Sequence, residues 1–125
     1  MIIGIGTDLA KIARFAAILQ RRPAAITRRL LTSSEQIAMQ KAASQAAFLA
    51  KRFAAKEALL KALGTGLRNG LSWQHMEVSN DALGKPIMQL NGTAAELAAA
   101  KGVKTIHLSI TDEKDMALAF VVLEG

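Results

Sequence analysis

Residues 1–8 read MIIGIGTD, an isoleucine-rich stretch that carries two glycines and ends on a carboxylate. Isoleucine is typical of strands, and side chains alternate between the two faces of a strand, so Gly4, Gly6 and Asp8 share one face. Glycine weakens the interior of a strand unless another group must approach its backbone closely. We therefore predict a strand over Ile2–Asp8, in which the glycines leave room beside Asp8 for close packing or for a ligand.

Length and composition fit one compact domain over residues 1–125, because 51% of the residues are hydrophobic and can fill a core. The chain has no cysteine, which excludes a disulfide framework and a thiolate zinc site. The N-terminal apolar run is too short for a signal peptide, and no segment approaches the length of a membrane span. We expect a cytoplasmic protein with no membrane partner.

Positive charge is concentrated near the N-terminus. The formal net charge is +6, and residues 1–29 carry six basic side chains against the single acid Asp8. Such a block predicts an acidic partner. We expect no nucleic-acid partner, because only four Phe, one Trp and no Tyr are available to stack on bases and no nucleic-acid-binding motif is present. The six basic residues are Lys11, Arg14, Arg21, Arg22, Arg28 and Arg29.

Apolar periodicity, capping boxes and helix breakers predict four helices. The first helix covers Leu9–Gln20 and is followed by the helix breaker Pro23, and the second starts at the capping box Thr32–Glu35 and ends at about Ala43. The third runs from about Gln45 to Leu63 and is ended by Gly64, and the fourth starts at the capping box Thr93–Glu96 and ends at Gly102.

Alternating apolar residues predict four further strands, paired in two antiparallel hairpins. Met76–Ser79 and Ile87–Leu90 flank the turn-rich segment NDALGKP, and Lys104–Thr111 and Met116–Leu123 flank DEKD. The fold class is α+β, with helices packed on a small, mainly antiparallel sheet.

The longest helix carries a second unusual pattern in FLAKRFAAKEALLKALGTG, residues 48–66. Glu57 and Lys61 lie four residues apart beside the apolar arc and can face one another. Taken alone, they are an ordinary surface ion pair. Arg52 and Lys56 project into the arc itself, which requires that their stems snorkel or that a ligand or subunit meets them.

Asp8 and His107 also have structural explanations. Asp8 directly precedes a predicted helix and is a candidate N-cap, while Leu9 breaks the G-x-G-x-x-G dinucleotide fingerprint. His107 lies on the hydroxyl-rich face of its strand, opposite the apolar face. A histidine in that position is more often exposed or structural than catalytic.

Three motifs change this assessment: GIGTDL near the N-terminus, RFAAKEALLKALGTG in the middle and HLSIT before the last strand. In this order, and over essentially the whole chain, they resemble the holo-acyl-carrier-protein synthases, the small type of 4'-phosphopantetheinyl transferase. The resemblance implies transfer of 4'-phosphopantetheine from coenzyme A to a serine of apo acyl carrier protein, releasing adenosine 3',5'-bisphosphate, in fatty acid biosynthesis. It also implies a magnesium ion and a homotrimer with active sites between adjacent subunits.

The resemblance assigns roles to the acids and to Lys61. Asp8 and Glu57 match the metal-binding acids of the family, and magnesium commonly uses one or two carboxylates plus substrate phosphates. Lys61 is placed to stabilise the leaving group or to donate a proton to it. Glu57 is the preferred base, acting directly or through a metal-bound water.

Coenzyme A and the carrier protein are assigned to further residues by the same resemblance. The GKP residues are expected to come from the neighbouring subunit, His107 to orient a ligand, and the basic face of the first helix to dock the acidic carrier. The coenzyme A residues are Arg52, Lys56, Lys61, Gly64, Thr65, Gly66, Lys85, Pro86 and His107, and the carrier residues are Lys11, Arg14, Arg21 and Arg22.

Two departures from the family pattern matter. Residues 44–47 read SQAA where many relatives are basic, which removes the usual contact to the 3'-phosphate, and Asp112 stands where relatives often have a histidine. Two other functions remain open at this point. A basic binding module would show salt-sensitive nucleic-acid binding, and a coenzyme A-dependent acyltransferase would need an acyl donor and no magnesium.

Overall fold

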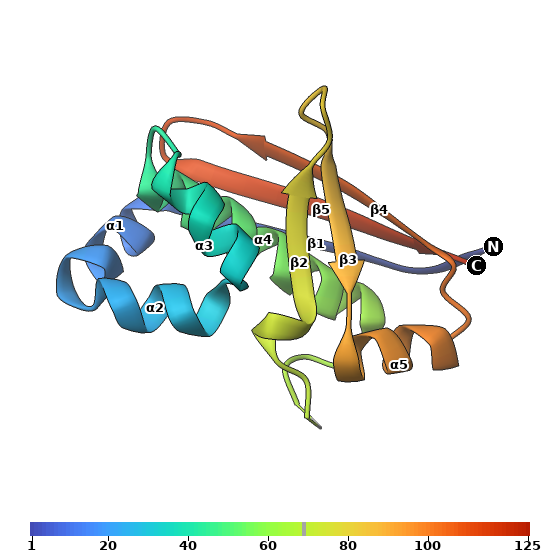
Figure 1. Cartoon of the computed structure of the whole chain (residues 1–125). Helices are drawn as coiled ribbons and strands as arrows, with labels where there is room; N and C mark the ends of the chain where they lie inside the picture. Colours follow the sequence, from blue (N-terminus) through green and yellow to red (C-terminus); the bar gives the residue numbers. More distant parts are fainter. Residues whose placement is uncertain (69) are drawn as a thin grey trace.

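The structure is a computed structural model that describes residues 1–68 and 70–125, within which there are five helices, five strands and one 3-10 turn (Figure 1). The helices are α1 (Ile12–Arg21), α2 (Pro23–Leu30), α3 (Ser33–Gln40), α4 (Gln45–Leu63) and α5 (Gly92–Ala100). The strands are β1 (Ile2–Lys11), β2 (Met76–Asn80), β3 (Pro86–Leu90), β4 (Thr105–Asp112) and β5 (Met116–Glu124), and the 3-10 turn η1 (Trp73–His75) precedes β2.

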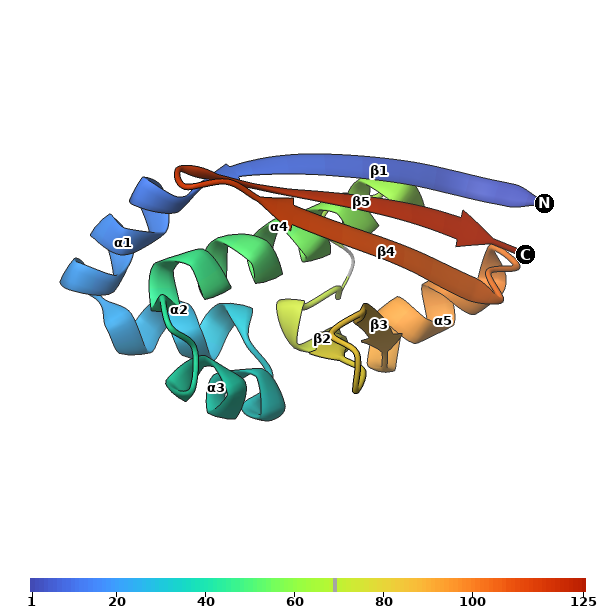
Figure 2. The ribbon, with the colours of Figure 1, turned by 90° about the horizontal axis from the view of Figure 1, so that it is seen from above.

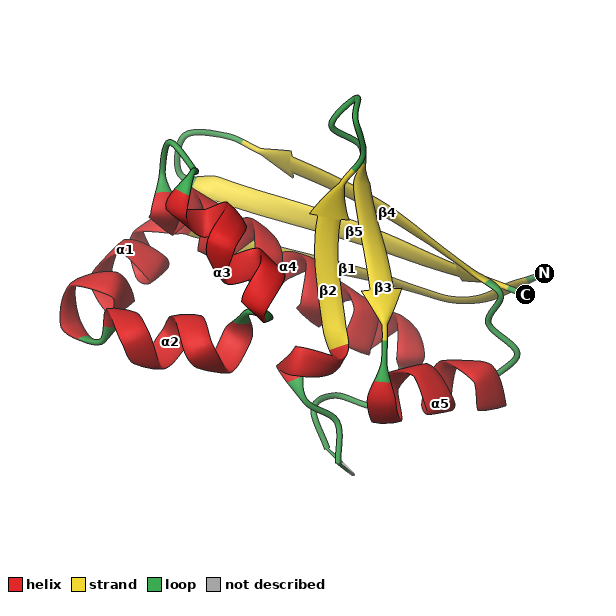
Figure 3. Ribbon diagram, viewed as in Figure 1, coloured by secondary structure: helices red, strands yellow, loops and turns green. Residues whose placement is uncertain are grey.

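The strands form two antiparallel sheets. One has the order β1-β5-β4, and β2 and β3 pair separately as a hairpin (Figure 3). Seen from above, α4 runs along one face of the three-stranded sheet, with α1, α2 and α3 gathered near one end and α5 near the other (Figure 2). The α+β prediction is confirmed, although the hairpin does not join the larger sheet.

Helix α4 forms the centre of the hydrophobic core. Its residues Leu49, Leu59 and Leu60 are fully buried, as are Val121 and Leu123 of the sheet. The sequence predicted both of its ends. The Ser44 hydroxyl caps the start by accepting a hydrogen bond from the backbone N–H of Ala47 at 3.2 Å, and Gly64 ends the helix with a left-handed φ of 78°.

The boundary between the first strand and first helix was predicted wrongly. Strand β1 continues to Lys11, because Leu9, Ala10 and Lys11 still pair in register with β5. Helix α1 therefore starts at Ile12 rather than Leu9, and Asp8 is not its N-cap. The prediction also missed α2. Pro23 follows the end of α1 but starts a new helix, because a backbone N–H in the first helical turn has no partner within the helix and proline can lack it without loss.

The two predicted capping boxes had different outcomes. At α3, Thr32 and Glu35 form both reciprocal hydrogen bonds, although the helix ends at Gln40 rather than near Ala43. At α5, the helix starts at Gly92 with Asn91 as N-cap, so the Thr93–Glu96 box does not form. The four strand predictions after the first are confirmed to within one residue at each end. None of the helices in the described part of the chain is long and apolar enough to cross a membrane.

Candidate functional site

Close packing of β1 on α4 places Asp8 beside the long helix. A side-chain carbon on Gly4 would overlap the carbonyl oxygen of Ala62, and one on Gly6 would overlap that of Ala58. The two glycines therefore let the backbones of strand and helix meet directly. Asp8 is the next residue on the same face, so its carboxylate is directed at α4.

Lys61 reaches Asp8 from α4. Its Nζ donates to Asp8 Oδ1 at 3.0 Å and to the carbonyl oxygen of Thr7 at 2.9 Å. The Asp8 side chain is 13% exposed and the Lys61 side chain 55%, so the pair lies at the edge of the core. The other carboxylate oxygen of Asp8, Oδ2, is buried and has no hydrogen-bond partner. It is an acceptor left free for another group.

Glu57 lies in the same electrostatic environment. Burial raises the pKa of Glu57, the negative charge of Asp8 raises it further, and the positive charges of Lys61 and Arg14 oppose the shift. The charges of Asp8 and Lys61 thus both act on Glu57, while the prediction that the three form one catalytic site stays a prediction. Arg14 was expected only at the carrier-binding face, but its positive charge also opposes the upward shift in the pKa of Glu57.

Asp8 and Glu57 fit a magnesium ion by their chemistry. Among the described residues, no three His, Asp or Glu side chains converge to form an all-protein metal cage. Magnesium does not need one, because it keeps several waters and is bound through one or two carboxylates together with substrate phosphates. The free oxygen of Asp8 and the carboxylate of Glu57, on which the charge of Asp8 acts, suit that mode of binding.

Lys56 does not face a ligand. It is fully buried, and its Nζ donates to Glu35 Oε1 at 2.7 Å, to the Leu30 carbonyl at 2.6 Å and to the Trp73 carbonyl at 3.1 Å. These contacts use all three donors of an ammonium group. The charged partner of Lys56 inside the apolar arc is thus the buried carboxylate of Glu35. The predicted contact between Lys56 and coenzyme A does not fit this buried position.

Arg52 and Pro86, predicted to contact coenzyme A, line one cavity of about 230 Å³. The lining comes from α4, from the β2–β3 hairpin and from the end of β4: Phe48, Lys51, Arg52, Asn80, Gly84, Pro86, Ile110 and Asp112. Lys85 lies in the hairpin turn, where its backbone N–H donates to Asp81 Oδ1 at 2.9 Å. Sequence reasoning did not single out Lys51, whose position one residue before Arg52 was the available signal.

The Gly64–Thr65–Gly66 loop follows directly from the end of α4. Gly64 and Gly66 have left-handed φ values of 78° and 66°, which favour glycine. The hydroxyl of Thr65 is buried without a hydrogen-bond partner, and Thr65 borders a small cavity of about 90 Å³. The loop therefore holds a polar atom that is free to meet a ligand.

His107 lies apart from Asp8 within one chain. It faces outward from β4, exposed, and its Nε2 is 2.8 Å from Glu124 Oε1. The hydrogen bond from His107, followed by its charge, lowers the pKa of Glu124. Asp8 faces inward from β1, and β5 lies between the two strands. A single chain does not bring these two predicted site residues together.

The predicted carrier-binding residues are all exposed. Arg21 and Arg22 border a hollow of about 380 Å³ together with Ile18. Lys11 ends β1 and precedes α1 instead of lying on it. The guanidinium carbon of Arg14 lies 5.1 Å from the ring centroid of Phe53 in α4, a cation–π contact. Arg14 therefore packs on α4 in addition to its predicted place on the carrier-binding face.

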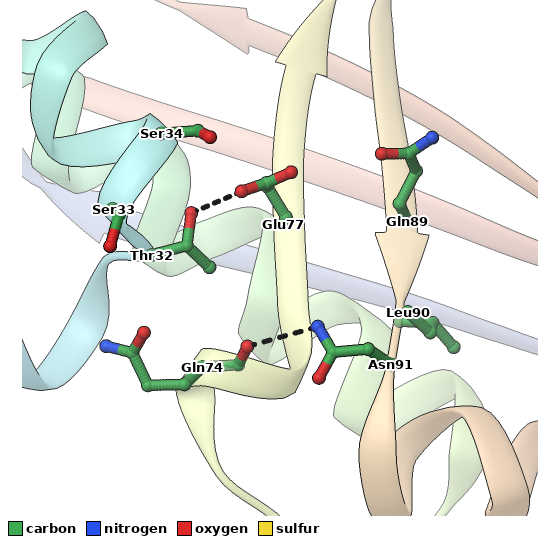
Figure 4. A pocket seen from close by; sticks show the side chains of 8 residues that line it. All are labelled: Thr32, Ser33, Ser34, Gln74, Glu77, Gln89, Leu90 and Asn91. Carbon is green, nitrogen blue, oxygen red and sulfur yellow. Dashed lines mark hydrogen bonds between the residues drawn. The ribbon is translucent and has the colours of Figure 1, made fainter.

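A separate polar cavity of about 640 Å³ lies between the start of α3 and the β2–β3 hairpin (Figure 4). The Thr32 hydroxyl donates to Glu77 Oε1 at 2.6 Å, and Asn91 Nδ2 donates to the Gln74 carbonyl at 3.4 Å. This cavity contains none of the predicted catalytic residues. Sequence reasoning missed it because its walls come from segments far apart in the chain.

Comparison with known proteins agrees with the motifs. A sequence profile of the 4'-phosphopantetheinyl transferase superfamily matches residues 4–121. The holo-[acyl-carrier-protein] synthase of Yersinia enterocolitica is 49% identical over 124 residues, covering 99% of this chain and 98% of that protein.

Solved structures give the same result. The crystal structure of holo-[acyl-carrier-protein] synthase from Neisseria meningitidis has a TM-score of 0.93 at 39% identity and covers 100% of both chains. The structure of a holo-(acyl-carrier-protein) synthase from Bacillus anthracis in complex with CoA (3',5'-ADP) has a TM-score of 0.83 at 36% identity, covering 98% of this chain and 96% of that one. Because the family model matches nearly the full length and a relative is 49% identical over 99% of it, the chain belongs to the 4'-phosphopantetheinyl transferase superfamily.

Proposed function

We propose that this chain is a holo-acyl-carrier-protein synthase, which transfers the 4'-phosphopantetheine group of coenzyme A to a serine of apo acyl carrier protein. The observation that supports the proposal is the hydrogen bond between Lys61 and Asp8 beside the free Asp8 Oδ2, together with the charges of both residues acting on Glu57. The relatives that match nearly the full chain carry this name, and one of them is a complex with CoA (3',5'-ADP).

The reaction needs a base, a charge-stabilising group and oriented phosphates. The serine oxygen forms a bond to the phosphorus that carries the pantetheine arm, and the bond from that phosphorus to the bridging oxygen breaks. The serine proton passes to Glu57, and the bridging oxygen leaves with adenosine 3',5'-bisphosphate. Lys61 stabilises the negative charge on that oxygen or donates a proton to it.

Magnesium is the proposed cofactor, held by Asp8 and Glu57. When bound, it supplies charge neutralisation at the phosphoryl oxygens. Asp8 also fixes the position of Lys61 through their 3.0 Å hydrogen bond. The chain's own residues therefore orient both the pyrophosphate and the group that meets the leaving oxygen.

Coenzyme A is proposed to contact Arg52, Pro86 and the loop that contains Thr65. The cavity at Arg52 also holds the cation Lys51, and the free hydroxyl of Thr65 offers a polar contact. Lys51 is our candidate for the role of the basic residues that are missing at 44–47. The other proposed contacts are Lys61, Gly64, Gly66, Lys85 and His107.

Carrier protein is proposed to dock on the exposed basic residues Lys11, Arg14, Arg21 and Arg22. Their charge complements an acidic partner. Arg14 lies between this face and the acids of the site, because it packs on Phe53 and its charge acts on Glu57. Docking at α1 would therefore deliver the serine close to Glu57.

A homotrimer with active sites between subunits is the proposed assembly. Its support is the outward face of the three-stranded sheet, where Ile5 is 62%, Leu9 60% and Phe120 38% exposed. Such apolar exposure favours burial against another copy. A trimer would also give His107 and Lys85 access to a neighbouring site. Light scattering tests this, and a fully active monomer at assay concentration would contradict it.

Mass spectrometry of apo acyl carrier protein, incubated with the enzyme, coenzyme A and magnesium, tests the proposed function. We expect a mass increase of one phosphopantetheine group on the carrier and release of adenosine 3',5'-bisphosphate. Transfer of an acyl group alone, without magnesium, would instead support an acyltransferase.

A further inference from the structure

A buried ion cluster links the start of α3 to α4 and β2. Glu35 is buried, and its carboxylate accepts hydrogen bonds from the backbone N–H of Thr32 at 2.9 Å, the backbone N–H of Val78 at 2.8 Å and Lys56 Nζ at 2.7 Å. Its Oε2 lies 3.7 Å from Arg52 Nε. Three elements thus fix this carboxylate in one position beside Arg52.

Arg52 connects the cluster to the 230 Å³ cavity that it lines. Its guanidinium carbon lies 4.3 Å from the ring centroid of Phe48, and its Nη2 donates to Asn80 Oδ1 at 3.5 Å. Its Nε is buried and makes no hydrogen bond. Arg52 is therefore held by stacking, by one long hydrogen bond and by the charge of Glu35.

The cluster has an excess of positive charge. Among the described residues, the buried charged side chains are Glu35, Arg52 and Lys56, one anion against two cations. Glu35 is closer to Lys56, at 2.7 Å, than to Arg52, at 3.7 Å, and the half-buried Glu77 adds negative charge on the Lys56 side. Arg52 is thus the less compensated cation, and an anion in the cavity would balance it.

We propose that Glu35 is a positioning residue for the anionic nucleotide end of coenzyme A: it holds the Arg52 guanidinium in place at the cavity wall. This inference rests on the proposed function, in which Arg52 contacts coenzyme A. Glu35 touches no substrate and acts only through Arg52. It deepens the proposal by connecting the capping box of α3 to substrate affinity.

The Glu35→Gln variant tests this inference. Without the carboxylate, Arg52 is free to change rotamer, so we expect the KM for coenzyme A to rise about tenfold while kcat at saturating coenzyme A is unchanged. Calorimetry should give a similar rise in the Kd of adenosine 3',5'-bisphosphate. In an Arg52→Gln background, Glu35→Gln should have no further effect on either constant, because the two residues act as one unit.

Folding must be separated from positioning, since Glu35→Gln leaves the Lys56 ammonium buried without its carboxylate. The Glu35→Gln/Lys56→Met double variant removes both charges and avoids that penalty. The matched control is Glu77→Gln, which also removes a carboxylate bonded to Thr32, whereas the ion pair with Arg52 is made by Glu35. We expect the control to keep the wild-type KM for coenzyme A.

Unchanged KM and Kd in the folded double variant would overturn the inference, as would an equal loss of affinity with and without Arg52. A wild-type protein that neither modifies the carrier nor binds the bisphosphate would overturn the proposed function, and the inference with it. The two failures are therefore distinguishable.

Discussion

Gly6 of β1 lies directly against the main chain of α4 at Ala58. A methyl group on residue 6 would overlap the Ala58 carbonyl oxygen and come within 2.7 Å of the amide nitrogen of Ala62. Neither atom can move without distorting the helix that carries Glu57 and Lys61. The contact therefore sets the position of Asp8, two residues further along β1, relative to both.

Gly6→Ala should consequently damage stability and activity together. We expect a loss of about 1–3 kcal/mol or more in the free energy of unfolding by urea, because the strand must move away from the helix. The transfer rate should fall as Asp8 shifts. Thr7→Ala, at the adjacent outward-facing residue, is the matched control and should lose less of both. Equal stability of the two variants would show that the backbones are not in tight contact.

Glu57→Gln should stabilise the protein at neutral pH. The pKa of Glu57 is raised in the fold, chiefly by burial and then by Asp8, so its contribution to stability is present at low pH and lost as pH rises through the folded pKa. Glutamine removes this penalty. In magnesium-free buffer we expect a higher Tm than wild type at about pH 7, with the difference shrinking towards about pH 4.

The exposed residue Glu96 provides the control for the loss of one negative charge. Glu96→Gln should shift Tm less than Glu57→Gln between the same two pH values. If the two variants follow the same pH dependence, Glu57 does not have the environment described here.

Lys61→Ala should lower kcat more than it raises the KM for coenzyme A. The ammonium is held by Asp8 and by the Thr7 carbonyl, so it is positioned before the leaving group develops its charge. Removal of one such preorganised contact costs about 100-fold or more in kcat. Lys101→Ala, an exposed lysine near α5, should behave like wild type. A higher KM with unchanged kcat would make Lys61 a binding residue only.

Arg21→Glu should raise the KM for carrier protein and leave the KM for coenzyme A nearly unchanged. Arg21 is exposed beside the hollow at Ile18, and loss of a charge-assisted contact costs on the order of 1.5–3 kcal/mol, less at the rim. Arg21 is a cleaner test than Arg14, which also packs on Phe53. Lys101→Glu makes the same charge change elsewhere, and an equal effect of the two would exclude specific docking at α1.

Local signals predicted most of the fold. The Thr32–Glu35 capping box, the Gly64 stop and the alternation of β4 and β5 depend on neighbouring residues, and those features are found where expected. The boundary at Leu9 could not be read locally, because pairing with β5 overrides the helical periodicity of residues 9–11. Pro23 was ambiguous for a local reason, since proline both ends one helix and suits the first turn of the next.

The site was predictable only in part. The resemblance to the family, and not the local pattern, assigned Asp8, Glu57 and Lys61 to one site, since the spacing of Glu57 and Lys61 alone indicated only a surface ion pair. The partner of Lys56 could not be identified, because Glu35 was identified only as half of a capping box and reaches α4 through tertiary packing. The cavity at Arg52 likewise joins segments that are distant in the sequence.

The most direct test of the account is the single-turnover rate at which wild-type protein and Glu57→Gln modify apo acyl carrier protein, followed by mass spectrometry at saturating coenzyme A and magnesium. We predict that wild type adds one phosphopantetheine group per carrier and that Glu57→Gln, folded and at least as stable, is slower by about 100-fold or more. A Glu57→Gln rate close to that of wild type would contradict the assignment of the transfer reaction to Asp8, Glu57 and Lys61.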